Sequence, residues 1–205
     1  MTTKETILYK ALIMFSEKGY EGVSMRDIAS EVGIKAASIY NHFKSKEDIF
    51  NSLIKMMDER YRVFVNTMHI PGFDPLDAAE RYLGIEESEL QTIAKDLFLY
   101  FLKDEYSSAF RRMLTVEQYR NSQAGQVYQS LFIEGVIEFQ SIIFKILSEQ
   151  NYFIDCDPQV AAYQFYAPIL LLLSRYDLKP EKEEEALKLL ENHVHQFTKI
   201  YLKDK

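Results

Sequence analysis

The chain has 205 residues, of which 47% are hydrophobic and 27% charged, a balance that is ordinary for a soluble globular protein. Seven glycines and five prolines are few for an all-β chain with its many turns, so the composition favours helices. The single cysteine, Cys156, excludes an intrachain disulfide. Because the N-terminus lacks a signal-peptide core and no apolar stretch is long enough to cross a membrane, we expect an all-α cytoplasmic protein with no membrane partner.

The net charge of −7 argues at first against a nucleic-acid partner, but the charge is unevenly distributed. Residues 1–50 carry equal numbers of basic and acidic side chains, so the whole net negative charge lies in the rest of the chain. Between Val32 and Lys46 there is no acidic side chain, whereas Lys35 and Lys44 are basic. DNA binding needs only such a local positive surface, with few phosphate contacts per subunit.

The first two predicted helices are short and clearly bounded. A brace helix runs over about 4–18 and ends at Gly19. Ser24 is a good N-cap for the second helix, and Asp27 completes a capping box three residues later. Gly33 then ends this helix, where a left-handed residue is needed.

A third helix is expected from about Lys35, with Ala36, Ile39 and Phe43 on its inner face. The second and third helices with their glycine turn are typical of a helix-turn-helix, whose second helix enters the DNA major groove. Ser45 then caps a fourth helix over 47–68 that links this region to the rest. We therefore predict a DNA-binding domain at 1–46 and a second, helical domain at 47–205.

The remaining residues predict further helices after a break at 69–75, which contains two prolines and a glycine. Gly84 is a point at which the first of them could divide. About nine helices are expected in all, the later ones over 76–101, 106–119, 123–149, 158–176 and 181–202. Pro168 should kink the helix that contains it.

Residues from about Lys4 to Phe50 resemble the N-terminal domain of the tetracycline-repressor (TetR) family of bacterial transcription regulators. The resemblance rests on fixed offsets, namely Glu17-Lys18-Gly19-Tyr20, Arg26-Asp27-Ile28-Ala29, Gly33-Ile34 and Ser38-Ile39-Tyr40-x-His42-Phe43-x-Ser45-Lys46-Glu47. It implies an all-α repressor that binds an inverted-repeat operator as a homodimer and is released by a small, largely apolar ligand. The domain at 47–205 would then be the helical ligand-binding and dimerisation domain. Ligand binding would shift the fourth helix and so change the spacing of two recognition helices, which must match one DNA turn of ~34–36 Å.

The resemblance places Tyr40 and His42 at phosphate or base-edge contacts and Lys46 where it would clamp the phosphate backbone. Phosphate contacts fix register without selecting sequence. Asn41 is suited to adenine, and Lys35 or Arg26 to guanine, so we expect half-sites that are A·T-leaning where the third helix touches them. The full predicted DNA-binding set is Ser24, Arg26, Lys35, Ala36, Ala37, Ser38, Tyr40, Asn41, His42, Lys44 and Lys46.

Two features of the second domain have a functional and a plain structural interpretation. Its many Tyr and Phe residues suit an apolar cavity with polar handles, although each taken singly fits a plain core. The predicted ligand-binding residues are Tyr100, Met113, Tyr119, Tyr128, Phe132, Tyr163, Gln164 and Tyr166, with Gln164 alternatively satisfying a backbone group.

The last helix has an apolar seam that either packs within its own domain or, as the resemblance implies, forms a dimer interface with the preceding helix. The predicted interface residues are Ile169, Leu172, Leu187, Leu190, Val194, Phe197 and Tyr201.

Other functional classes find little support in the sequence. His193 and His195 lie two apart on a predicted helix and point to different sides, so no metal site or cofactor is expected. No nucleotide-binding or nucleophile motif is present, and no enzyme activity is predicted. In the competing hypothesis the DNA-binding domain is the same, but the second domain is regulated by a protein partner instead of a small molecule.

Overall fold

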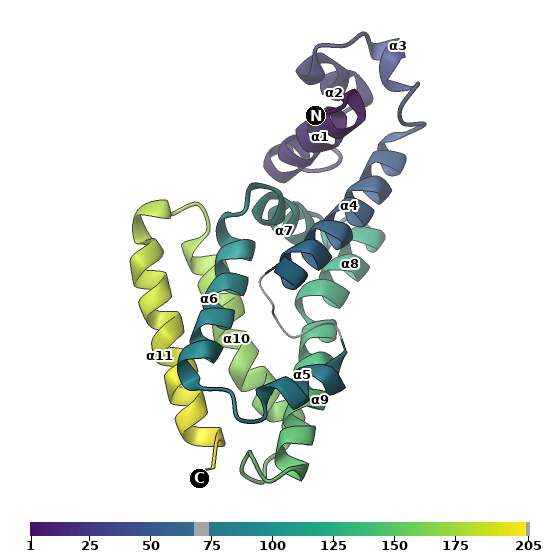
Figure 1. Ribbon diagram of the computed structural model, residues 1–205. Coiled ribbons are helices and arrows are strands. Elements are labelled where there is room, and N and C mark those ends of the chain that lie inside the picture. The colour runs from purple at the N-terminus through teal and green to yellow at the C-terminus, as the bar shows by residue number, and fades with distance from the viewer. Residues whose placement is uncertain (68–73, 204–205) are drawn as a thin grey trace. The chain divides into compact units, whose positions relative to one another are not determined.

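The computed structural model describes residues 1–67 and 74–203. Within this part of the chain there are eleven α-helices and one short 3-10 helix, and the only extended pairing is an isolated bridge between Phe153 and Leu202. The predicted all-α fold is therefore confirmed, with more helices than expected (Figure 1). Packing divides the chain into two compact units, Met1–Phe64 with Lys103–Tyr128, and Val65–Leu102 with Gln129–Lys205. The functional division at residue 46 remains a prediction.

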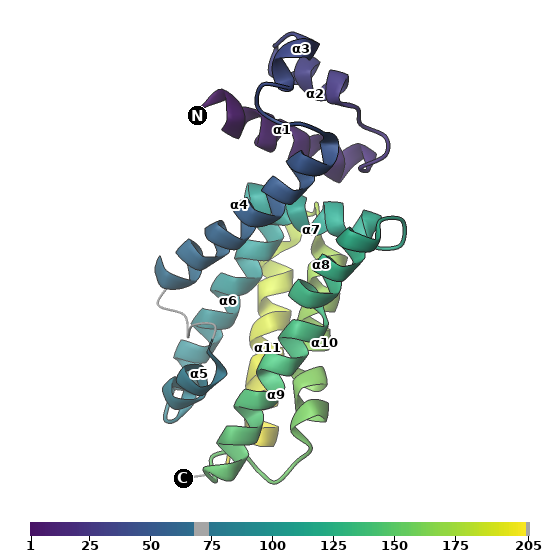
Figure 2. The ribbon, with the colours of Figure 1, turned by 90° about the vertical axis from the view of Figure 1, so that its right-hand side faces the viewer.

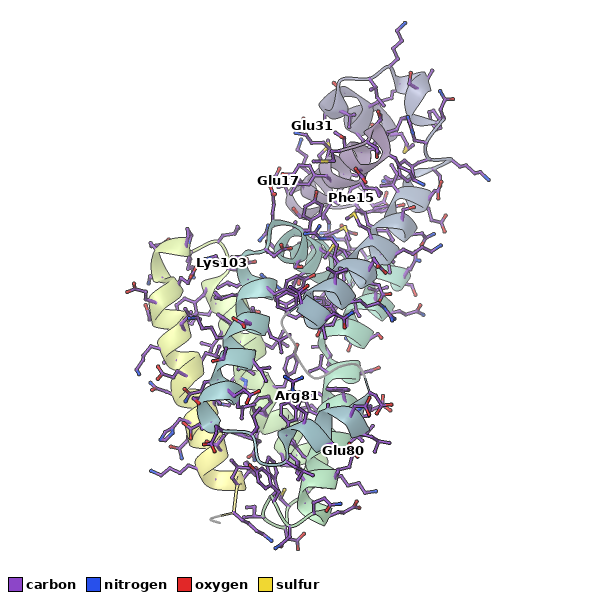
Figure 3. All side chains as sticks on the ribbon, in the orientation of Figure 1. Phe15, Glu17, Glu31, Glu80, Arg81 and Lys103 are labelled. Atoms are coloured by element: carbon purple, nitrogen blue, oxygen red, sulfur yellow. The ribbon has the colours of Figure 1, made fainter. Side chains whose placement is uncertain are left out.

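The first unit begins with α1 (Thr3–Lys18), which a capping box starts: the Thr2 hydroxyl accepts from the Glu5 N–H, and the Glu5 carboxylate accepts from the Thr2 N–H. Its inner face packs against α2 and α7 and buries Ile7, Leu8, Ala11, Leu12, Met14 and Phe15. Figure 3 shows Phe15 directed into this unit and Glu17 at its surface. Burial of this apolar stripe makes α1 the brace that the sequence predicts.

The helix-turn-helix is formed by α2 (Met25–Val32) and α3 (Ala36–Ile39). The Ser24 capping box is present, and Gly33 is left-handed with φ of 78°. The third helix is shorter than predicted, because turns follow it: the N–H groups of His42 and Phe43 both donate to the Ile39 carbonyl oxygen. Phe43 nevertheless points inward, with 1% of its surface exposed.

Three further helices contribute to the first unit. The predicted Ser45 cap starts α4 (Lys46–Thr67), since the Asp48 N–H donates to the Ser45 hydroxyl at 3.1 Å. Met68, the predicted end of this helix, lies outside the described residues, as do residues 69–73 of the predicted break. Asp104 caps α7 (Glu105–Glu117), which packs along α1, and α8 (Ser122–Phe132) begins in this unit.

The second unit contains α5 (Pro75–Tyr82), α6 (Glu87–Lys103), α9 (Glu134–Glu149), α10 (Pro158–Tyr176) and α11 (Glu183–Tyr201), which follows the 3-10 helix Pro180–Lys182. Both ribbon views show α9 beside α10 (Figures 1 and 2), and α11 also packs on α10. Their core is rich in aromatic side chains: the Phe165 and Phe197 ring centroids lie 4.8 Å apart, and those of Phe197 and Tyr201 lie 4.5 Å apart.

Two predicted helix boundaries have different outcomes. A division at Gly84 is confirmed, because Gly84 has φ of 84° between α5 and α6. The single helix predicted over 123–149 is wrong, since the chain breaks at Ile133, whose φ and ψ are −130° and −84°. Gly135 makes this break possible: a Cβ there would lie 2.1 Å from the Ser130 carbonyl oxygen. Pro168 lies inside α10, which the structure assigns as one helix, and the expected kink stays a prediction.

Candidate DNA-binding surface

The segment from Lys35 to Lys44 presents most of its side chains to solvent. Ser38 is half-buried, whereas the exposed members are Lys35, Ala36, Ala37, Tyr40, Asn41, His42 and Lys44. The segment is anchored by Ile39 and Phe43, which are 0% and 1% exposed. The fold thus brings the predicted DNA-contacting side chains of this segment onto one supported, solvent-facing stretch.

The neighbouring helices α1 and α2 carry two contacts of charged side chains near this segment. The Lys4 ammonium lies 5.4 Å from the centroid of the Phe43 ring, which places a further cation beside the end of the segment. Lys10 of α1 pairs with Glu31 of α2 at 3.0 Å. Lys4 is not among the predicted DNA-contacting residues, although its position in the first turn of a capped helix was visible from Thr2 and Glu5.

The two predicted contacts at the start of α2 differ in their surroundings. Arg26 is exposed. The Ser24 hydroxyl is engaged in the capping box, donating to the Asp27 carboxylate at 2.6 Å and accepting from the Asp27 N–H at 3.2 Å. Hydrogen bonds from the Ser24 hydroxyl and backbone N–H lower the pKa of Asp27. Ser24 therefore serves first as a cap, with its hydroxyl already occupied.

Lys46, the predicted phosphate clamp, is held by the loop after α1. Its ammonium donates to the Tyr20 carbonyl oxygen at 2.7 Å and lies 4.1 Å from the centroid of the Tyr20 ring. The Glu21 carboxylate is 3.6 Å away on the solvent side. Burial is the main cause that raises the pKa of Tyr20, followed by the charges of Glu21, Glu47 and Glu117. Lys46 is thus oriented before any DNA arrives, and an ammonium has three donors, so one hydrogen bond leaves others for a phosphate.

Comparison with known proteins places this region in a known class. Residues 7–53 match the model of the "Bacterial regulatory proteins, tetR family". Over 52 residues the chain is 48% identical to IcaR of Staphylococcus aureus strain Newman and 42% identical to IcaR of Staphylococcus epidermidis, each described as a negative transcriptional regulator of the biofilm operon icaADBC. Residues 7–53 are thus similar to the region that defines the TetR family. The matched segment covers 25% of this chain and 28% of IcaR, so the likeness to IcaR is confined to this region.

Several solved structures share the fold along nearly the whole chain. A TetR-family regulator from Mesorhizobium loti is 19% identical, with a TM-score of 0.70 over 98% of this chain and 97% of its own. A regulator from Saccharomonospora viridis in complex with choline is 19% identical, with a TM-score of 0.66 over 98% of both chains. SmeT in complex with triclosan is 19% identical, with a TM-score of 0.64 over 100% and 93%. At these identities the likeness establishes the fold alone.

The predicted ligand-binding residues are divided between the two units. Met113, Tyr119 and Tyr128 belong to the first unit, and the others to the second. Tyr119 is 90% exposed and Tyr163 52% exposed, whereas Met113 is fully buried. The side-chain oxygen of Gln164 accepts a hydrogen bond from the Tyr201 hydroxyl, so one of its polar atoms is bonded to a side chain of α11.

Most of the predicted dimer seam is packed inside its own unit. Leu172, Leu190, Val194, Phe197 and Tyr201 are each less than 9% exposed, and Ile169 and Leu187 pack partly buried against the core around Phe98 and Tyr176. A different stripe of α10 and α11 is exposed, consisting of Val160, Tyr163, Leu171, Leu189 and Ile200. The helical period identified the apolar face correctly, but that face meets the protein's own core.

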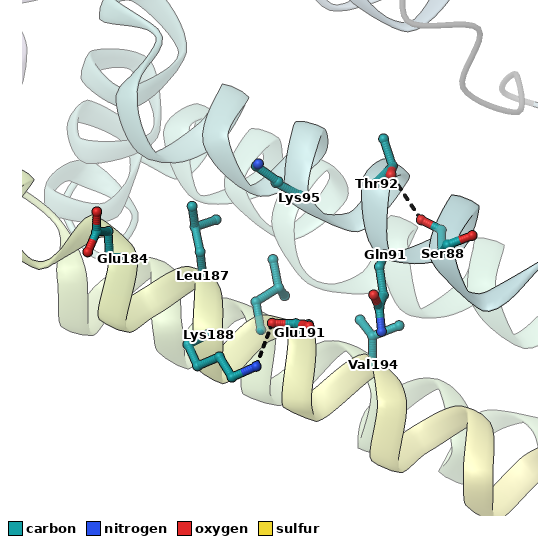
Figure 4. A pocket seen from close by; sticks show the side chains of 10 residues that line it. Ser88, Gln91, Thr92, Lys95, Glu184, Leu187, Lys188, Glu191 and Val194 are labelled. Carbon is teal, nitrogen blue, oxygen red and sulfur yellow. Dashed lines mark hydrogen bonds and ion pairs between the residues drawn. The ribbon is translucent and has the colours of Figure 1, made fainter.

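A groove of about 400 Å³ runs between α6 and α11 in the second unit (Figure 4). Its floor is apolar, with Leu187, Leu190 and Val194, and its rim is polar. The rim residues are Ser88, Gln91, Thr92, Lys95, Glu184, Lys188 and Glu191, and the Lys188 ammonium pairs with the Glu191 carboxylate at 2.9 Å. None of the predicted ligand-binding residues lines this groove.

The two histidines of α11 have separate partners. His193 Nε2 lies 2.7 Å from the Phe165 carbonyl oxygen, and His195 Nδ1 lies 2.8 Å from a Glu87 carboxylate oxygen. Interaction with His195 is the main cause that lowers the pKa of Glu87. Over residues 1–67 and 74–203, no three His, Cys, Asp or Glu side chains are grouped as a metal would require. No helix in the same ranges is long and apolar enough to span a membrane.

Proposed function

We propose that this chain is a sequence-specific, DNA-binding transcriptional repressor. The observation that carries the proposal is the segment from Lys35 to Lys44, in which two buried anchors, Ile39 and Phe43, support an outer row of small, amide and basic side chains. Small side chains allow close approach to base edges, Asn41 can pair with adenine, and the lysines can contact phosphates. The described negative regulation by the IcaR proteins supports repression over activation.

The repressor is proposed to act as a homodimer on an inverted-repeat operator. One such segment contacts too few base pairs to be specific. Proteins with a helix-turn-helix therefore commonly bind as dimers to two half-sites one helical turn apart. The exposed apolar stripe of α10 and α11 supports this, because Leu171 is 66% exposed and Ile200 50% exposed, and aligned apolar side chains on a helix surface mark an interaction site.

Release by a small, largely apolar ligand bound in the helical domain is the proposed control. The triclosan and choline complexes of similarly folded proteins support a ligand of this size. In the alternative, the second domain is regulated by a protein partner. The two proposals differ in whether a small molecule or a protein releases the DNA.

A gel-shift measurement tests these proposals together. The purified protein should bind a fragment of its own promoter in preference to a scrambled duplex at moderate salt, and equal affinity for both would refute the DNA-binding function. Addition of candidate hydrophobic effectors to the bound complex should then release the DNA. Release only by a protein fraction would support the alternative.

A further inference from the structure

Glu117 is a buried carboxylate in an unfavourable position. It is the last residue of α7 and is 1% exposed, although both burial and the negative end of the helix dipole disfavour an acid there. Its Oε1 accepts a hydrogen bond from the Tyr20 backbone N–H at 2.8 Å. Its Oε2 has no hydrogen-bond partner among the described residues. A residue that breaks a local rule without an evident gain in stability points to a functional role.

The loop after α1 is shaped to receive this carboxylate. Gly19 has φ of 75° and ψ of 160°, a conformation open essentially to glycine alone. A Cβ at Gly19 would lie 2.9 Å from Glu117 Oε1, too close for an unmoved neighbour. Gly19 therefore both forms the turn and leaves the space through which Glu117 reaches the Tyr20 N–H.

Tyr20 connects Glu117 to Lys46 through its backbone and its ring. Its N–H is held by Glu117, and its carbonyl oxygen accepts from the Lys46 ammonium at 2.7 Å. Its ring is fixed between Phe15 and Phe50, with centroids 5.2 and 5.5 Å away, and supports the same ammonium at 4.1 Å. Glu117, Tyr20 and Lys46 thus form one continuous chain of contacts inside the first unit.

We propose that Glu117 is a positioning residue for DNA binding, which acts through Tyr20 to hold the Lys46 ammonium where a DNA phosphate can accept from it. This inference rests on the proposed DNA-binding function. Glu117 lies outside the matched segment at 7–53, so the contact gives α7 direct control over that segment. Any event that withdraws the C-terminal end of α7 from Tyr20 would free Lys46 and weaken binding to all sequences alike.

The test compares three substitutions of Glu117 on the promoter fragment over a series of salt concentrations. Glu117→Gln keeps an oxygen acceptor and should bind with nearly the wild-type affinity. Glu117→Met has a similar size but no strong acceptor, and should bind DNA about tenfold more weakly. The slope of log affinity against log salt concentration should also be smaller by about 0.9 for each phosphate that Lys46 no longer neutralises. Glu117→Asp withdraws the carboxylate by one methylene and should behave like the Met variant. If Glu117→Met fails to fold, Glu117→Asp still tests the inference.

A double-mutant cycle separates positioning from a general loss of structure. Combined with Lys46→Ala, Glu117→Asp should add little further loss, whereas combined with Lys35→Ala the two losses should multiply, since Lys35 lies outside the chain of contacts. Multiplicative losses with Lys46→Ala, or wild-type affinity in the Asp variant, would overturn the inference. A wild-type protein that does not prefer its promoter would instead overturn the proposed function itself.

Discussion

The hydroxyl of Tyr9 on α1 donates a hydrogen bond to the carboxylate of Glu105, the first residue of α7. This hydrogen bond is the main cause that raises the pKa of Tyr9 from its ordinary value of 10.0 to about 12. The Tyr9 ring also lies 5.3 Å from the ring of Tyr106. Helix α7 is therefore tied near its start to α1 by this pair, and near its end to the loop after α1 by the hydrogen bond between Glu117 and Tyr20.

The Tyr9 pair predicts a loss of stability at high pH. Because the folded-state pKa is raised, the contribution of the pair is complete below the unfolded value and disappears as pH rises through about 12. Tyr9→Phe should lower the free energy of unfolding by about 1 kcal/mol near neutral pH. The difference from the wild type should vanish in strong alkali, as measured by urea unfolding. A difference that stays constant with pH would contradict this, and Tyr40→Phe, at a 55% exposed site, is the control.

Asn41→Ala should change the DNA sequence preference. The exposed amide is suited to a pair of hydrogen bonds with adenine, so its loss should cost roughly 1–3 kcal/mol of binding and relax one base position. Competition with operators substituted at single positions measures both effects. An equal loss on every sequence would reject a base-contacting role. A footprint with G·C-rich contacted steps would contradict the expected A·T-leaning half-sites.

Lys46→Ala should weaken binding to all sequences alike and also lower the stability of the fold. The second effect follows from the hydrogen bond to Tyr20, whose removal should lower the free energy of unfolding by about 1 kcal/mol. Lys44→Ala is the matched control, because the Lys44 side chain is exposed. It should reduce affinity with no change in the thermal midpoint. Equal midpoints for both variants would show that the Tyr20 contact adds nothing to stability.

Local sequence determined the parts of the fold that were predicted well. The Ser24 capping box and the left-handed Gly33 depend on neighbours within a few residues, so their residue types were sufficient. Burial of Ile39 followed from helical spacing in the same way, whereas Phe43 is buried as expected although turns, not the predicted helix, position it. The exposed segment between Lys35 and Lys44 could therefore be placed from the sequence alone.

Contacts between distant residues could not be placed in this way. The bond from Tyr20 to Glu117 joins residues 97 apart, and nothing near either residue signals it. The aromatic residues carried too little information to separate core from pocket: Met113 and Tyr119 were assigned together, yet one is fully buried and the other 90% exposed. In α10 nearly every side chain is apolar, so periodicity could not tell that Leu172 faces the core and Leu171 faces solvent.

The exposed stripe of α10 and α11 predicts where dimerisation can be broken. Leu171→Glu and Ile200→Glu each place a carboxylate at a position that is 66% or 50% exposed in the single chain. In a dimer these positions would become buried, and an unpaired buried charge costs several kcal/mol, enough to shift the dissociation constant about 100-fold or more.

Sedimentation at micromolar concentration should therefore give a dimer for the wild type and a monomer for each variant. Ile142→Glu on α9 introduces the same charge at a 37% exposed apolar position outside the stripe and should leave the dimer intact. A dimer that survives both stripe substitutions would place the interface elsewhere, whereas a wild-type monomer would remove it. Because two half-sites must be held together, the monomeric variants should also lose their preference for the promoter while keeping weak, salt-sensitive binding to any duplex.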